Sequence, residues 1–219
     1  MEEIRKEFEV YFENENKEEA VKYVISKLEA KEIDVIDLYC HILTPLLNSM
    51  ESKQEDERIS IWKEHVKTGM VRTIVENCYP YIIIKRNELN LPKKGVAAVL
   101  CPPEEYHDLG ARMVADFLTV AGYDTIFVGS NTPYQDFYNA VHMIQPVLVA
   151  ISVSNYYHIV SAKRMIEELK QAIKHPLKIV VGGNAFHGDN SEKFKAVGAD
   201  YYARTYEDIL KIANGEVEL

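Results

Sequence analysis

The feature that most constrains the fold is a change of hydrophobic period at residues 91–95, which read Leu-Pro-Lys-Lys-Gly. After this segment, short apolar runs alternate with amphipathic helical patterns, which is typical of parallel strands joined by helices. The expected strands lie near residues 96–101, 124–129, 147–153, 178–181 and 200–203. The expected helices lie near 108–121, 134–144, 157–174, 190–196 and 205–213. We therefore predict an α/β fold, with a flavodoxin-like, doubly wound sheet of five parallel strands.

The residues before this segment carry only helical patterns. In residues 17–30, for example, one helical face gathers the apolar residues Ala20, Val21, Val24, Ile25 and Leu28. The expected helices cover residues 2–12, 17–30, 34–50 and 58–85. Helices joined by short polar loops predict a four-helix bundle. The chain is thus expected to hold two domains, a helical bundle over 1–91 and an α/β domain over 92–219.

Composition argues against several classes of protein. A formal charge of −9 offers no basic surface for a phosphate backbone, so direct binding to nucleic acid is not expected. No apolar stretch approaches the roughly 20 residues of a membrane span, and the polar, acidic amino terminus does not resemble a signal peptide. The three cysteines, Cys40, Cys78 and Cys101, lack metal-type spacing and indicate reduced thiols. We expect a cytoplasmic protein without a membrane segment.

A candidate metal ligand lies at the carboxyl end of the first expected strand, where residues 105–110 read Glu-Tyr-His-Asp-Leu-Gly. Open α/β sheets build their binding sites at this edge. Glu105 can accept the proton of one ring nitrogen of His107 and leave the other nitrogen free for a metal. Gly110 allows close approach of a backbone or a ligand. Alone the pattern is weak, because a loop histidine beside an acid is more often a solvated polar residue.

Three further strand ends fall on the same edge of the predicted sheet. Residues 129–133, Gly-Ser-Asn-Thr-Pro, end the second strand and lead into a helix whose first turn is expected to begin at Pro133. Ser152 and Ser154 end the third strand with hydroxyl groups, and Gly182 and Gly183 end the fourth without side chains. Each has an ordinary explanation, since serines cap helices and paired glycines form turns. Together with His107 they predict a slot between the first, third and fourth strands that holds an extended ligand tail. His158, which follows this strand, is expected to be a cap or surface residue.

The motifs at this edge resemble the signature of the cobalamin-binding domains, in which a helical bundle precedes a Rossmann-like domain. That signature is Asp-x-His-x-x-Gly, then Ser-x-Leu, then Gly-Gly. The matching residues here are Glu105, His107 and Gly110, then Ser152 and Ser154, then Gly182 and Gly183. The resemblance covers nearly the whole chain. It implies cobalamin as the cofactor, in an adenosyl, methyl or hydroxo form that the sequence leaves open.

The resemblance also implies a role for each of these residues. In such proteins the histidine replaces the cofactor's own dimethylbenzimidazole as the lower cobalt ligand, which assigns that role to His107. Glu105 would orient the ring of His107. The displaced nucleotide tail would lie along the slot lined by the serines and glycines, namely Ser152, Ser154, Gly182 and Gly183.

Two departures from the signature bear on the branch of the family. Glu105 stands in place of Asp, a variant associated with light-sensing regulators of the MerR type. Methyl-carrying corrinoid proteins usually read Asp-x-His-Asp-x-Gly-Lys, and Ala111 occupies the position of that lysine. Ser154 in place of Leu makes the tail slot more polar. A longer carboxylate still reaches the ring nitrogen, so neither departure removes binding on physical grounds.

The predicted bundle resembles the cap of the sensor branch. There a helix with adjacent Glu and His lies over the upper face of the corrin, and a tryptophan about three turns earlier packs on the upper axial group. Glu64 and His65 match the pair, but Gln54 occupies the tryptophan position, and Trp62 lies too close to the pair to be equivalent. Without the resemblance, His65 would be interpreted as a polar residue on a solvated helix face.

Three functional classes follow from these patterns. The first is a cobalamin-binding sensor or regulatory module that signals to a separate partner, since the sequence shows no DNA-binding domain. The second is a corrinoid carrier that serves separate methyltransferases. The third is an interaction protein that has lost the cofactor. The Glu-x-His motif and the Glu64-His65 pair favour the sensor. No general acid and base pair is apparent, so we expect no catalysis by the chain alone; the oligomeric state stays open, a homo-oligomer included.

Overall fold

The computed structural model describes residues 1–50, 60–187 and 192–217. Its packing divides the chain into two compact units, Met1–Lys85 and Arg86–Leu219. The division falls within helix α6 (Tyr79–Leu89), a few residues before the segment where the hydrophobic period changes. Each unit has its own buried interior.

The first unit is helical. Its elements are α1 (Glu2–Glu13), α2 (Lys17–Glu29), α3 (Val35–Asp37), the wider helical segment η1 (Leu38–Leu43), α4 (Thr44–Met50), α5 (Ser60–Asn77) and the start of α6. Asn16 caps α2 by accepting a hydrogen bond from the amide of Glu19. The largest buried side chains of the unit include those of Phe8, Phe12, Tyr39 and Ile74. The predicted helical bundle is thus a helical region with its own core.

Two prolines interrupt helices that the hydrophobic pattern presents as continuous. A proline lacks an amide hydrogen, and its ring clashes with the carbonyl four residues earlier in a regular helix. Before Pro45 the helix widens, and the amide of Thr44 donates to the carbonyl of Tyr39, five residues back. Before Pro80 the expected helix over 58–85 ends at Asn77, and α6 begins after a turn at Cys78. The prediction of one uninterrupted fourth helix was therefore wrong.

The second unit contains the predicted five-stranded parallel sheet. The strands are β1 (Val96–Leu100), β2 (Asp124–Gly129), β3 (Leu148–Ser152), β4 (Lys178–Gly182) and β5 (Tyr201–Tyr202). Their order in the sheet is β2-β1-β3-β4-β5, and every neighbouring pair is parallel. This is the flavodoxin-like order, so the predicted α/β class is confirmed. The order reverses at β1 and β3, and ligands of open α/β sheets bind at such a point.

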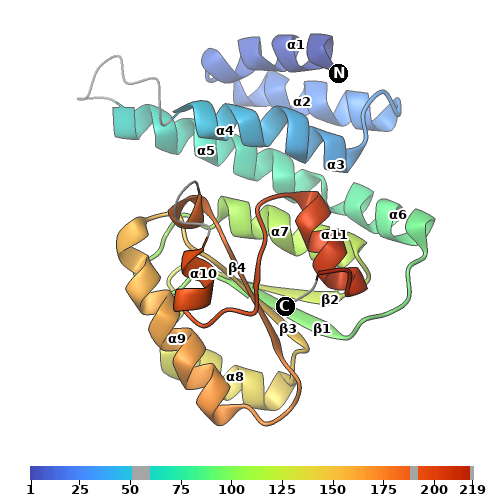
Figure 1. Cartoon of the computed structure of the whole chain (residues 1–219). Helices are drawn as coiled ribbons and strands as arrows, with labels where there is room; N and C mark the ends of the chain where they lie inside the picture. Colours follow the sequence, from blue (N-terminus) through green and yellow to red (C-terminus); the bar gives the residue numbers. More distant parts are fainter. Residues whose placement is uncertain (51–59, 188–191, 218–219) are drawn as a thin grey trace. The chain divides into compact units, whose positions relative to one another are not determined.

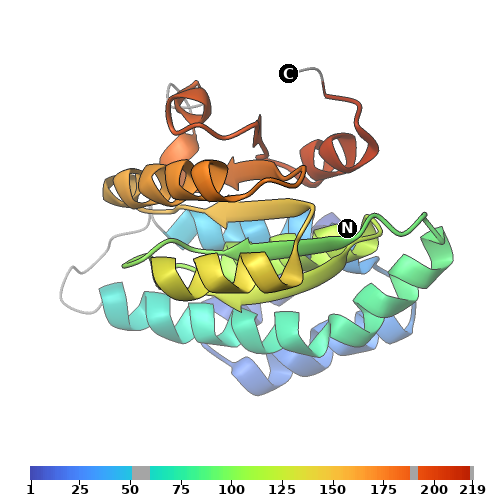
Figure 2. The same cartoon turned by 90° about the horizontal axis from the view of Figure 1, so that it is seen from below.

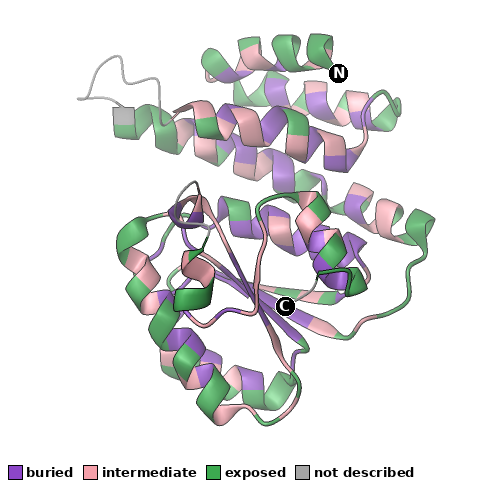
Figure 3. Ribbon diagram, in the orientation of Figure 1, coloured by how far each residue is buried: buried purple, intermediate pink, exposed green. Residues whose placement is uncertain are grey.

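Helices cover both faces of this sheet. They are α7 (Leu109–Val120), α8 (Tyr134–Ile144), α9 (Ile159–Ala172), α10 (Lys193–Ala196) and α11 (Tyr206–Asn214). Helices α7 and α11 lie on one face of the sheet, and α8 and α9 lie on the other (Figures 1 and 2). Between α7 and α11, the ring centroids of Phe117 and Tyr206 are 5.0 Å apart. The three central strands, β1, β3 and β4, are largely buried (Figure 3). Among the described residues, no helix is long and apolar enough to cross a bilayer.

Candidate cofactor-binding site

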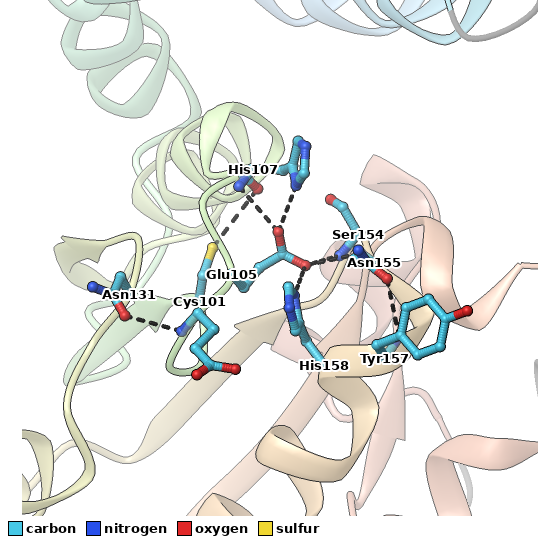
Figure 4. A network of polar contacts seen from close by, with 9 residues as sticks. Cys101, Glu105, His107, Asn131, Ser154, Asn155, Tyr157 and His158 are labelled. Atoms are coloured by element: carbon cyan, nitrogen blue, oxygen red, sulfur yellow. Dashed lines mark hydrogen bonds and ion pairs between the residues drawn. The ribbon is translucent and has the colours of Figure 1, made fainter.

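The register of the sheet brings three chain segments to one edge. Leu100 at the end of β1 pairs with Ile151 of β3, and Ser152 at the end of β3 pairs with Gly182 at the end of β4. Because all three strands are parallel, the loops that follow them emerge at the same edge. The loop after β1 carries Glu105 and His107, and the loop after β3 meets it there (Figure 4).

Glu105 is the centre of the polar network at this edge. Its side chain is 0% exposed, and both carboxylate oxygens accept hydrogen bonds (Figure 4). Oε1 accepts from the backbone amide of His107 at 3.0 Å and lies 2.6 Å from Nδ1 of the same residue. Oε2 accepts from the amides of Ser154 and Asn155 at 2.9 and 2.8 Å, and lies 3.1 Å from Nδ1 of His158. These donors offset the cost of burying a charge.

The network keeps Glu105 ionised. Burial raises the pKa of this carboxyl, but the hydrogen bonds from the backbone of Asn155 and His107 and from the rings of His107 and His158 outweigh burial and lower the pKa to about 2. An ionised carboxylate only accepts hydrogen bonds, so Nδ1 of each histidine carries a proton. In the neutral ring of His107 the lone pair then lies on Nε2, the nitrogen directed away from Glu105.

His107 is placed to offer that nitrogen to a ligand. Its side chain is 59% exposed, although the carboxylate that holds it is fully buried. Gly110 lies in the first turn of α7, and a methyl group added there would meet no protein atom within 4 Å. The structure therefore combines an oriented, unprotonated ring nitrogen on His107 with open space in the first turn of α7.

The nearby thiol of Cys101 has a different character. Cys101 is buried at the end of β1, and its Sγ lies 3.8 Å from the carbonyl oxygen of His107. Burial, together with the negative charges of Asp108 and Glu105, raises the pKa of this thiol to about 12. A protonated thiol is a poor metal ligand, because the thiolate is the coordinating form. Cys101 thus belongs to the core beneath the site.

The loop after β2 braces the segment that carries Glu105. The amide of Glu104 donates to the side-chain oxygen of Asn131 at 2.9 Å, and the amide of Asn131 donates to the carbonyl of Glu105 at 2.9 Å. Both Glu104 and Asn131 have left-handed backbone angles, with φ of 69° and 47°. Residues 129–133 were expected at this edge of the sheet, but no supporting role was predicted for Asn131. The available signal was its place in the turn-forming segment Gly-Ser-Asn-Thr-Pro, residues 129–133.

Gly182 ends β4 and Gly183 follows it, and backbone packing within the chain requires both glycines. Gly183 has φ of 97°, and a side chain there would collide with the backbone of Val153. A Cβ atom on Gly182 would lie 2.7 Å from the carbonyl oxygen of Ala203. The glycines therefore permit close backbone packing, a role the sequence analysis did not assign. Contact with a nucleotide tail, for these glycines and for the half-buried Ser152 and Ser154, stays a prediction.

The remaining predicted site residues lie in the helical unit. Glu64 and His65 are adjacent and exposed near the start of α5, and Trp62 beside them is 71% exposed. Gln54, which occupies the tryptophan position of the sensor branch, lies outside the described residues. The pair is thus free to meet a ligand on its own unit's surface, and its part in cofactor binding stays a prediction.

His158 has a contact beyond its expected role as a cap or surface residue. It occupies the N-cap position of α9, without a side-chain capping bond. Its side chain is 18% exposed, and its Nδ1 lies 3.1 Å from Oε2 of Glu105. The contact joins residues 53 positions apart, because β1 and β3 are neighbours in the sheet. No local pattern in the sequence carries such a signal.

Comparison with known families agrees with this geometry. The B12 binding domain family matches residues 95–212, more than half of the chain, and the chain belongs to this family. The resemblance drawn from the sequence motifs is confirmed, and so is cobalamin as the cofactor. The exposed ring nitrogen of His107 and the open space at Gly110 fit such a group.

Individual relatives fall into two groups. Trimethylamine corrinoid protein 1 of Methanosarcina mazei is 29% identical over 107 residues, 48% of each chain. The HTH-type transcriptional repressor CarH of Myxococcus xanthus is 27% identical over 144 residues, 66% of this chain and 46% of the repressor. The matches thus span about half the length of these relatives. The solved monomethylamine corrinoid protein of Methanosarcina barkeri covers 99% of both chains with a TM-score of 0.78 and 18% identity, which shows a shared fold.

Proposed function

We propose that this protein binds cobalamin with Nε2 of His107 as the lower cobalt ligand and acts as a sensor or regulatory module that signals to a separate protein. The observation that carries the proposal is the contact of 2.6 Å between Oε1 of Glu105 and Nδ1 of His107, in a ring that is otherwise exposed. When bound, the cofactor supplies a cobalt centre whose upper ligand can be exchanged or lost.

The chain's own residues have separate tasks in this proposal. Glu105 holds the proton of His107 on Nδ1, which orients the ring and increases the basicity of Nε2. Gly110 leaves room for the cofactor in the first turn of α7. The ends of β3 and β4 accept the nucleotide tail through Ser152, Ser154, Gly182 and Gly183. Glu64 and His65 act on the upper side of the cofactor, so that a change of upper ligand alters the helical unit and is read by the partner. No reaction catalysed by the chain alone is assigned.

Three observations support the sensor over other members of the family. The motif has Glu105 where the carriers usually have Asp, and Glu64 and His65 form an exposed pair on α5. In addition, the 144-residue similarity to CarH is longer than the part of the chain that follows residue 94, so it extends into the helical region. A corrinoid carrier for a methyltransferase system is the second candidate. It is favoured by the similarity to the trimethylamine corrinoid protein.

The visible absorption spectrum tests the proposal and separates the two candidates. The protein is reconstituted with hydroxo-, methyl- and adenosylcobalamin, and each form is measured in the dark and after illumination, with size-exclusion chromatography and limited proteolysis in parallel. A sensor should show hydrodynamic or proteolytic differences between cofactor forms, and His65→Ala should diminish them. Identical behaviour of all forms, together with methyl transfer to an added methyltransferase system, would establish the carrier instead.

A further inference from the structure

A cluster of lysines and tyrosines lies at the edge of the sheet opposite the proposed cobalamin site, where the strands begin. Lys178 is the first residue of β4, and Tyr201 is the first residue of β5. Lys94 precedes β1, and Tyr123 precedes β2. Because every neighbouring pair of strands is parallel, the amino ends of the strands meet at one edge. The two lysines therefore share a side of the sheet that the cofactor proposal does not use.

The amine of Lys94 faces a neutral acceptor. The residue is half-buried, and its Nζ lies 2.9 Å from Oδ1 of Asn214 at the end of α11. The same Nζ lies 6.0 Å from the centre of the ring of Tyr123. The amide nitrogen of Asn214 in turn donates to Oε1 of Glu216 at 3.2 Å. Asn214 thus stands between the lysine and a carboxylate that would stabilise its charge.

Lys94 lacks the ion pair that other half-buried lysines have. Lys85, for comparison, binds Asp34 at 2.7 Å. Within residues 1–50, 60–187 and 192–217, neither Lys94 nor Lys178 forms an ion pair with a carboxylate. Burial and the positive charge of Lys178 lower the pKa of the Lys94 amine, and the charge of Glu216 offsets them only in part. A larger fraction of Lys94 than of an exposed lysine is therefore neutral near neutral pH.

A neutral lysine amine is a nucleophile, and a neighbouring cation attracts anionic reagents. We propose that Nζ of Lys94 is an acylation site for small acyl phosphates, and that the ammonium group of Lys178 attracts their phosphate. Lys178 is half-buried, and its Nζ lies 5.8 Å from the centre of the ring of Tyr201. Since no carboxylate of the described part of the chain pairs with it, its charge is open to an anion. This inference does not depend on cobalamin binding.

The proposed step transfers the acyl group from oxygen to nitrogen. The lone pair of neutral Nζ forms a bond with the acyl carbon, and the bond from this carbon to the phosphate oxygen breaks. Phosphate leaves with that electron pair, and the proton released by the nitrogen passes to water. The products are an uncharged amide at Lys94 and inorganic phosphate. Acylation therefore also ends the repulsion between Lys94 and Lys178.

Acetyl phosphate tests the proposal on the full chain. Acetylation of each lysine is followed over time by mass spectrometry, at pH values from about 6 to 10. Lys93 is the matched internal control, because it is adjacent and exposed. Lys94 should react several-fold faster than Lys93 near neutral pH, and its rate should level off at a lower pH. Acetylation of Lys94 at the rate of Lys93 or more slowly would overturn the proposal.

Asn214→Asp tests the neutral acceptor. The substitution places a carboxylate against Nζ of Lys94, which favours the charged amine, so the rate of Lys94 should fall toward that of Lys93. Asn214 is exposed, so the variant should fold, and thermal unfolding checks this. An unchanged rate of Lys94 in the folded variant would contradict the proposal.

Lys178→Gln tests the attraction of the phosphate. Acetylation of Lys94 should slow more with acetyl phosphate than with the uncharged reagent N-acetoxysuccinimide. Lys174→Gln removes the same charge at an exposed position and should leave the rate of Lys94 unchanged. Equal slowing with both reagents in Lys178→Gln would overturn the role of Lys178. If Lys178→Gln does not fold, the ratio of Lys94 to Lys93 acetylation in the wild type, compared between the two reagents, decides: a higher ratio with acetyl phosphate supports the attraction, and an equal ratio overturns it.

Discussion

Oε1 of Glu105, a fully buried carboxylate, lies 2.6 Å from Nδ1 of His107, whose ring is 59% exposed. This pairing joins the interior of the α/β unit to its surface. Glu105 is held by donors from the loops after β1 and β3, so its carboxylate has a fixed position. This carboxylate in turn fixes the exposed ring of His107. A ligand on Nε2 would therefore meet a nitrogen whose direction and tautomer are set in advance.

Glu105→Gln should weaken cobalamin binding without abolishing it. The amide presents one oxygen and one NH2 group to five donors, so at least one oxygen position loses its acceptor. Loss of such a partner typically costs about 10 to 100-fold in metal affinity, and we expect a decrease in this range or less. Titration of the variant with hydroxocobalamin, followed by absorbance, checks the prediction. Unchanged affinity would show that Glu105 does not orient the ligand.

The low pKa of Glu105 predicts an acid-sensitive contribution to folding. Hydrogen bonds lower this pKa from 4.5 to about 2 in the folded protein, so the carboxylate stabilises the fold above its unfolded pKa, and this contribution is lost as the pH falls toward 2. The free-energy difference between the wild type and Glu105→Gln should thus be largest above about pH 5, on the order of 3 kcal/mol, and should narrow below it. Urea unfolding of both apoproteins between about pH 7 and 3 measures the difference. A difference independent of pH would contradict the assignment.

Gly110 and Gly183 should respond in opposite ways to the same change. Gly183→Ala forces a side chain into a left-handed backbone position and against Val153, so the apoprotein should lose about 1–3 kcal/mol of stability. Gly110→Ala meets no protein atom within 4 Å and replaces a helical glycine, so the apoprotein should be no less stable than the wild type.

Cobalamin affinity completes this comparison. Because Gly110 leaves open space in the first turn of α7, three residues after His107, Gly110→Ala should bind cobalamin more weakly while folding normally. Thermal unfolding of the apoproteins and cofactor titration separate the two effects. Full affinity in Gly110→Ala would show that the cofactor does not approach α7 at this point.

Local patterns in the sequence predicted most of the fold and part of the site. Alternating apolar runs located the five strands, and the spacing of Glu105 and His107 predicted their contact because both lie in one loop. The contact of His158 with Glu105 escaped prediction because it depends on the pairing of β1 with β3. The break at Cys78 could have been predicted, since Pro80 follows it within two residues.

Electron paramagnetic resonance of the cobalt(II) form tests the central claim most directly. In the wild type, a nitrogen on the lower face should split each cobalt line into three, and labelling histidines with ¹⁵N should convert the three lines into two. His107→Ala should abolish the splitting, while His142→Ala, in α8, should keep it. A splitting that survives in His107→Ala, or that ignores the ¹⁵N label, would contradict coordination by His107.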